Sequence, residues 1–95
     1  MARKHNLMLK KIKREFEKKK YFLFPTSEKL YSGVPDLVGL SPEGRFVGIE
    51  IKTEEGKNPE KLLRPTQKYF KDKIIKNKGE FFIFYGKGLI TRILE

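Results

Sequence analysis

The segment from Gly33 to Lys52 constrains the fold of this chain more than any other stretch of its sequence. Two apolar runs flank a Ser-Pro-Glu-Gly loop at residues 41–44, and this arrangement predicts a β-hairpin. Pro42 suits the second position of a type I turn, and Gly44 suits the left-handed position that closes a three-residue loop.

Closing this hairpin by pairing Ser41 with Arg45 places Asp36 directly opposite Glu50. The Cβ atoms of cross-strand partners lie about 4.5–5.5 Å apart, and two like charges at that distance are destabilising. Side chains alternate along a strand, so Lys52 shares the face of Glu50. Three apolar side chains point to the opposite face: Val47, Ile49 and Ile51.

Two carboxylates and an ammonium group held together predict a site for a hard divalent cation, which prefers oxygen ligands. The alternative is a surface hairpin whose charges are only solvated. An isolated Asp and a Glu-x-Lys are common enough that the remainder of the chain has to decide between these interpretations.

The residue types that are rare or missing narrow the chemistry that the chain can perform. Its 95 residues predict one domain, residues 1–95, near the lower size limit for a stable core. There is no cysteine, which excludes disulfides and cysteine-based zinc sites. His5 is the only histidine and lies in a basic N-terminus, which removes histidine-based triads and histidine-rich metal sites. Any catalysis is therefore expected to use carboxylates, lysines and water.

The formal net charge of +10 predicts a polyanionic partner, nucleic acid before a membrane surface. A basic protein without such a partner is the alternative. No apolar run approaches the roughly 18 residues of a membrane span, and no signal-peptide core is visible at the N-terminus. We therefore expect a soluble, cytoplasmic protein.

Residues 1–20 predict an amphipathic helix that contains nine basic and two acidic residues. Its apolar stripe recurs at helical spacing: Met8, Ile12 and Phe16. Glu15 lies about 60° from Ile12 around the helix, at the margin of this stripe, whereas Glu17 lies about 140° away on the solvated side. Glu15 is therefore the stronger candidate for a functional acid, and an ion pair with a lysine four residues away is its alternative role.

The order of elements predicts a mixed α/β domain with a central sheet. On the helix that begins at Pro65, Gln67 shares one face with Phe70 and Ile74 and is predicted to point towards the sheet. An ordinary helix-start glutamine is the alternative for Gln67. The predicted elements are the helix in residues 1–20, a strand at 21–24, a loop at 26–32, the hairpin, a loop at 53–59, a helical turn at 60–63, a helix from 65 to about 77 that Gly79 stops, a buried strand at 81–85, a turn at 86–88 and an edge strand at 89–94.

Gly33-x-Pro35-Asp36, thirteen further residues, Glu50-Ile51-Lys52 and a glutamine on the next helix form a recognisable pattern. This pattern resembles the VRR-NUC (virus-type replication-repair nuclease) branch of the PD-(D/E)xK nucleases, and the likeness extends from the first helix to the strand ending at Tyr85. The resemblance implies a restriction-endonuclease-like fold, with a mixed central sheet flanked by helices in the order α-β-β-β-α-β-β. It also implies stand-alone, phage-type membership, and host cytoplasm as the location if the gene is carried by a phage.

The resemblance implies a Mg²⁺ or Mn²⁺ site and assigns roles to particular residues. Asp36 and Glu50 correspond to metal-binding acids, Lys52 to the catalytic lysine and Gln67 to the helix glutamine. Glu15 corresponds to the first-helix acid, with Glu17 as its competitor, and the carbonyl of Ile51 completes the oxygen ligands. Basic side chains are expected to hold DNA phosphates: Lys10, Lys13, Arg14, Lys29, Lys57, Lys61, Arg64 and Lys68.

The expected function is that of a metal-dependent DNA endonuclease that hydrolyses phosphodiester bonds in branched DNA, four-way (Holliday) junctions in particular. The alternatives are a nuclease for flaps or forks, a non-catalytic nucleic-acid-binding module and a basic structural protein. One small domain with one site can cut one strand at a time, so we expect a twofold homodimer. Candidate interface residues are the last strand and two aromatics, for which core packing is the alternative: Leu89 to Leu94, Phe22 and Phe24.

Overall fold

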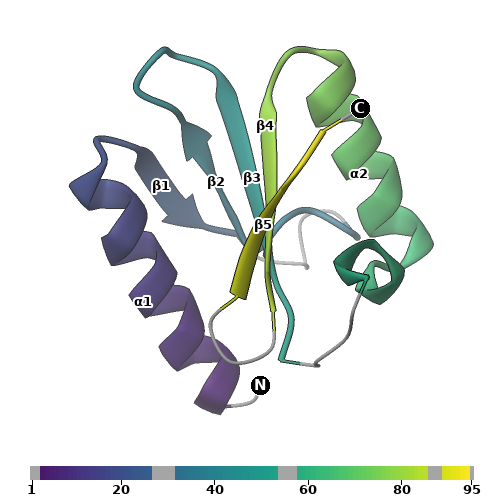
Figure 1. Ribbon diagram of the computed structural model, residues 1–95, viewed down its shortest axis with the longest axis horizontal. Helices are drawn as coiled ribbons and strands as arrows, with labels where there is room; N and C mark the ends of the chain where they lie inside the picture. Colours follow the sequence, from purple (N-terminus) through teal and green to yellow (C-terminus); the bar gives the residue numbers. More distant parts are fainter. Residues whose placement is uncertain (1–2, 27–31, 54–57, 86–88, 95) are drawn as a thin grey trace.

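The computed structural model of the protein describes residues 3–26, 32–53, 58–85 and 89–94. Within these residues a five-stranded sheet, ordered β1 to β5 as in the chain, is flanked by helices (Figure 1). The helical elements are α1 (Arg3–Lys18), the short 3₁₀ helix η1 (Pro59–Leu62) and α2 (Pro65–Lys76). The strands are β1 (Phe22–Pro25), β2 (Leu37–Leu40), β3 (Phe46–Ile51), β4 (Glu80–Tyr85) and β5 (Leu89–Ile93). The predicted α/β class and order of elements are confirmed.

The β2–β3 hairpin has the predicted register. The two strands pair antiparallel with Leu37 opposite Ile49, and the Ser41 N–H donates to the Arg45 carbonyl at 2.8 Å. Gly44 adopts a φ of +84°, the left-handed conformation that the three-residue loop requires. Parts of the predicted loops, residues 27–31 and 54–57, and the predicted turn at 86–88 lie outside the described residues.

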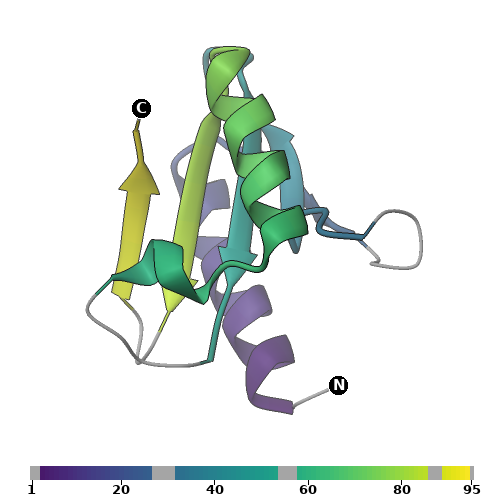
Figure 2. The ribbon, with the colours of Figure 1, turned by 90° about the vertical axis from the view of Figure 1, so that its right-hand side faces the viewer.

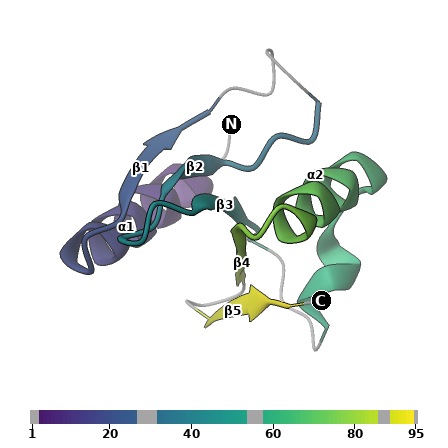
Figure 3. The same ribbon diagram turned by 90° about the horizontal axis from the view of Figure 1, so that it is seen from above.

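The two helices lie on opposite faces of the sheet. Strands β3 and β4 pair in parallel, so their connection crosses over one face, through η1 and α2 (Figure 2). Helix α1 packs on the other face, as the view from above shows (Figure 3). Among the described residues, no helix combines the length and the apolar character that crossing a membrane requires.

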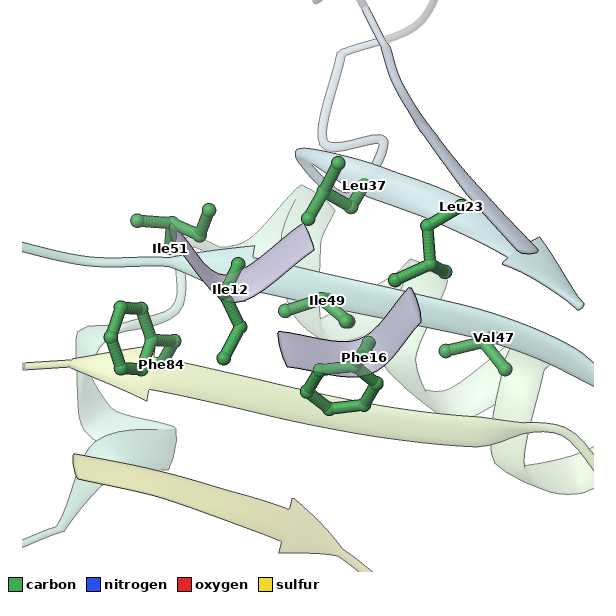
Figure 4. Close-up of a cluster of buried hydrophobic side chains, with 8 residues drawn as sticks. All are labelled: Ile12, Phe16, Leu23, Leu37, Val47, Ile49, Ile51 and Phe84. Atoms are coloured by element: carbon green, nitrogen blue, oxygen red, sulfur yellow. The ribbon is translucent and has the colours of Figure 1, made fainter. Parts of the chain in front are cut away.

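The face of the sheet covered by α1 carries the larger apolar cluster (Figure 4). Ile12 and Phe16 of α1, two members of the predicted stripe, are buried against side chains of four strands. Burying a side chain of this size contributes roughly 1.5–3 kcal/mol, so this contact fixes α1 on the sheet. The strand residues of the cluster are Leu23, Leu37, Val47, Ile49, Ile51 and Phe84.

Strand β4 is buried on both faces over much of its length, as its nearly continuous apolar sequence predicts. Phe84 joins the cluster under α1, whereas Phe81 and Ile83 pack with Ile74 of α2 and Leu63. The sheet therefore separates two apolar clusters, and α2 is anchored to its own face through the second.

Helix α2 begins as predicted, with Pro65 in its first turn after Arg64 as the N-cap residue. Its end differs from the prediction that Gly79 stops the helix. The left-handed residue there is Lys78, with a φ of 70°, and the Gly79 N–H donates to the Ile74 carbonyl at 2.8 Å. A Cβ atom added at Gly79 would lie 2.7 Å from the Ile74 side chain and from the Phe46 carbonyl oxygen, so position 79 has no room for a side chain. The left-handed conformation falls instead on Lys78, although it disfavours residues with a Cβ atom.

A polar cluster lies where β1 and β4 begin. The Tyr21 hydroxyl donates to Glu80 Oε1 at 2.7 Å, and Arg92 Nη2 lies 3.9 Å from Glu80 Oε2. Glu80 is buried. Burial of the phenol, followed by its hydrogen bond to Glu80, raises the pKa of Tyr21 to about 12.

We expect Tyr21→Phe to lower the free energy of unfolding by about 1–3 kcal/mol at neutral pH, because buried Glu80 loses a donor. The folded-state pKa of about 12 exceeds the ordinary value of 10.0. The contribution of Tyr21 is therefore complete below about pH 10 and is lost as the pH rises through about 12. Urea unfolding of both proteins at neutral pH and at about pH 11 measures this difference. A difference that grows at the higher pH would contradict the assignment.

Candidate active site

Asp36 is held at the start of β2 by backbone contacts from two other segments. The Thr26 N–H, just after β1, donates to the Asp36 carbonyl at 3.0 Å, and the Thr26 hydroxyl contacts the carbonyls of Pro35 and Asp36. The Asp36 carboxylate accepts a hydrogen bond from the Ile51 N–H through Oδ2 at 2.7 Å. The carboxylate is therefore fixed beside the C-terminal end of β3.

Glu50 lies on β3 opposite Asp36 in the continued hairpin register. It shares the face of Gly48, where an added Cβ would contact Ile74 of α2. Its side chain is buried, with 2% of the residue exposed. Burying an ionised carboxylate is costly unless a compensating charge lies nearby. The burial of Glu50 therefore indicates a functional role for this acid.

Lys52 and Gln67 form a contact between the end of the hairpin and α2, which agrees with the prediction that Gln67 points towards the sheet. Lys52 Nζ donates to Gln67 Oε1 at 2.8 Å, and the same oxygen accepts the Arg64 N–H at 2.8 Å. Gln67 is 2% exposed, so it points towards the sheet and is not an ordinary exposed helix-start residue. The Arg64 N–H fixes the amide oxygen of Gln67, and that oxygen in turn positions the Lys52 ammonium group.

The carbonyl of Ile51 lies on the Asp36 side of β3. Within a strand, the N–H and C=O of one residue point to the same neighbour, and the Ile51 N–H points to Asp36. The next residue alternates, and the Lys52 N–H donates to the Phe84 carbonyl of β4 at 2.8 Å. An oxygen ligand from Ile51 is therefore compatible with the backbone geometry.

Gly33 joins the segment before Asp36 to the start of α2. Its φ is +86°, and an added Cβ would lie 2.6 Å from the carbonyl carbon and oxygen of Thr66. The backbone can pass α2 this closely only without a side chain at position 33. The glycine and Pro35 together set the backbone path into Asp36 at the start of β2.

The donor set suits a hard cation, although the protein side chains do not form a complete cage. Among the described residues there is no group of three or more His, Cys, Asp or Glu side chains that could hold a metal ion. Mg²⁺ keeps several of its waters and is often held by only one or two carboxylates. Asp36, Glu50 and the Ile51 carbonyl therefore fit such an ion.

The structure does not bring Glu15 into this site, and the prediction that it is a metal ligand needs correction. Glu15 Oε2 lies 3.4 Å from Lys18 Nζ, and its side chain is 53% exposed. Glu17, the competitor, pairs with Lys13 at 2.7 Å. The α1 residue beside Asp36 is His5, which lies ten residues, or about 15 Å of helix, before Glu15.

The predicted DNA-binding residues lie in two described groups. Lys61, Arg64 and Lys68 are exposed at η1 and the start of α2, close to Gln67. Lys10 and Arg14 are exposed on α1, where Lys13 is half-buried. Lys29 and Lys57 lie outside the described residues.

Two residues of the site have no sequence signal that identifies them. Thr26 follows a strand and precedes a polar loop, which fits many ordinary threonines. His5 stands out in the sequence only as the lone histidine, within a basic helix. Their proximity to Asp36 depends on how β1 and α1 pack against the sheet.

One of three comparisons with known proteins finds a match, and it agrees with this architecture. A scan against protein-family models finds no match, and a search of curated proteins finds none. A search of solved structures finds a chain described as "VRR_NUC domain", with a TM-score of 0.66 and 27% sequence identity. The match covers 90% of this chain and 86% of that chain. The shared fold and sequence support a VRR-NUC domain with a restriction-endonuclease-like fold, which suggests a nuclease of the PD-(D/E)xK type.

Proposed function

We propose that this protein is a divalent-metal-dependent endonuclease that cuts branched DNA, with four-way junctions as its preferred substrate. The observation that supports it most is the arrangement at the end of β3, in a chain with a net charge of +10: the Asp36 carboxylate accepts the Ile51 N–H, between buried Glu50 and Lys52 in the chain, and Lys52 is held by Gln67. The VRR-NUC fold supports the nuclease class.

The proposed division of labour follows from the contacts of each side chain. Asp36, Glu50 and the Ile51 carbonyl would hold a Mg²⁺ or Mn²⁺ ion. Such an ion supplies a more acidic water and neutralises charge on phosphate oxygens. Lys52, held by Gln67, would orient the attacking water or offset the charge that develops on the phosphate.

The exposed basic residues would hold DNA through its backbone. Lys61, Arg64 and Lys68 lie in η1 and at the start of α2, and Lys10 and Arg14 form a second exposed basic group on α1. Phosphate contacts of this kind position DNA without reading its sequence. We therefore expect an affinity that falls steeply with salt and depends little on base sequence.

A homodimer would give the enzyme two sites for the two strands of a junction. Phe22 and Phe24 are 64% and 48% exposed, so core packing does not account for them. The register places Phe22 beside Leu40 and Leu40 beside Phe46, which makes an exposed apolar row across three strands. A row without charges does not suit a phosphate backbone, whereas a second copy presents the same row to it. The edge strand β5, with exposed Leu94 directly after it, is the other candidate interface.

Cleavage assays with end-labelled linear, flap, fork and four-way junction DNA test the proposal. We expect cutting with Mg²⁺ or Mn²⁺, none with EDTA, and paired symmetric nicks in opposing strands of the junction. Light scattering of the protein–junction complex should give two protein chains per junction. Binding without metal-dependent cutting of any substrate would instead support a non-catalytic binding module. Unpaired cuts confined to flaps or forks would contradict the junction preference.

A further inference from the structure

His5 is an α1 side chain that lies against Asp36. Its Nε2 lies 3.5 Å from Asp36 Oδ2, and the His5 and Asp36 side chains are only 15% and 19% exposed. The first turns of α1 and the C-terminal end of β3 lie at the same end of the sheet, at the bottom of Figures 1 and 2. The contact therefore joins the N-terminal part of α1 to the start of β2 at the candidate active site.

The second ring nitrogen of His5 makes this contact unusual for a structural histidine. Nδ1 is buried and has no hydrogen-bond partner among the described residues. Buried polar atoms are satisfied in the large majority of cases, so packing alone does not explain the side chain. A histidine held to stabilise the helix would be expected to use both nitrogens or to expose one.

We propose that His5 is a nitrogen ligand of the divalent ion that Asp36 helps to hold, an inference that rests on the proposed function. Adjacent ligands of an octahedral ion at about 2.1 Å lie about 3 Å apart, close to the separation of His5 Nε2 and Asp36 Oδ2. Neutral imidazole is a common metal ligand through either ring nitrogen. With His5, the first helix contributes a nitrogen donor where the sequence pattern predicts an oxygen donor from Glu15.

This ligand predicts a specific preference among metal ions. Mg²⁺ is a hard ion that favours oxygen, whereas affinity for imidazole rises along the series from Mn²⁺ towards later transition metals. We therefore expect His5→Gln to weaken Mn²⁺ binding about tenfold or more, and to weaken Mg²⁺ binding less. His5→Glu should shift the preference towards Mg²⁺, because it replaces nitrogen with carboxylate oxygen. Calorimetric titration of DNA-free protein with each ion measures both preferences.

Pulsed electron paramagnetic resonance of bound Mn²⁺ tests the ligand directly. The chain contains a single histidine, so an imidazole nitrogen signal in untagged wild-type protein can come only from His5. We expect this signal in wild type and in Glu15→Gln, and its loss in His5→Gln. The wild-type spectrum decides the matter even if a His5 variant folds poorly.

Mn²⁺ binding that depends on Asp36 but shows no nitrogen signal would overturn the inference and leave the proposed function intact. In that case an equal loss of Mg²⁺ and Mn²⁺ affinity in His5→Gln would mark His5 as a residue that only positions Asp36. Absence of any Mn²⁺ binding by the protein, alone or with junction DNA, would reject the proposed metal dependence and the inference together.

Discussion

Asp36→Asn and Glu50→Gln should each reduce DNA cleavage by at least about a thousandfold while four-way junction binding remains nearly unchanged. Each change keeps the size of the side chain and removes a negative charge that the proposed metal site needs. Losing several kcal/mol of transition-state stabilisation corresponds to a rate change of this size. The amide oxygen introduced by Asp36→Asn could still accept the Ile51 N–H, so the local backbone should be preserved.

Lys52→Met extends this prediction to the cation of the site. It should reduce the cleavage rate by about a hundredfold or more, because a positioned donor no longer offsets developing charge. Lys76→Met, which removes an exposed lysine at the far end of α2, is the matched control and should cleave at the wild-type rate. Single-turnover rates with saturating protein and junction affinities measured in Ca²⁺ separate catalysis from binding. A Lys52→Met rate equal to that of the control would remove Lys52 from the mechanism.

The features that were predictable from the sequence are those that local geometry fixes. The Ser-Pro-Glu-Gly loop selects one turn type, and the turn type sets the register that places Asp36 opposite Glu50. Pro65 similarly marks the start of α2 and fixes the helical phase that points Gln67 at the sheet. Both relationships follow from local backbone geometry, so they can be inferred from the sequence without knowledge of the tertiary contacts.

The position of Glu15 in the fold could not be predicted from local geometry. Helical periodicity gives the angle of Glu15 around α1, but it does not say which end of the helix meets the acid pair. That depends on the direction in which α1 crosses the sheet, which is a property of the packed fold in which Ile12 and Phe16 are buried. The same packing brings His5 to Asp36, and no spacing in the sequence encodes it.

The aromatic residues of β1 were ambiguous for a related reason. Alternation places Phe22 and Phe24 on the face opposite Leu23, but it does not say whether a helix covers that face. In the structure α1 covers Leu23, while Phe22 and Phe24 stay exposed. Coverage depends on the width of the sheet relative to its helices, which is a property of the assembled fold.

Gly33→Ala should destabilise the protein far more than Gly44→Ala, although both glycines have the same left-handed conformation. Their φ values are +86° and +84°, so an alanine at either position costs about 1–2 kcal/mol in backbone strain. At Gly44 nothing lies within 4 Å of the added Cβ, so backbone strain is the whole expected loss of stability. At Gly33 the Cβ would lie 2.6–2.7 Å from atoms of Thr66, which adds about 1–3 kcal/mol or more.

The functional consequence separates the two variants further. The added atom at position 33 can be accommodated only if the Gly33 segment and the start of α2 move apart. That movement would shift Asp36 on one side and Gln67, with Lys52, on the other. We therefore expect urea unfolding to show a loss at least twice as large for Gly33→Ala, and cleavage to fall only in that variant at temperatures where both are folded. Equal stability losses in the two variants, with wild-type cleavage in both, would show that the close passage at Thr66 does not set the geometry of the site.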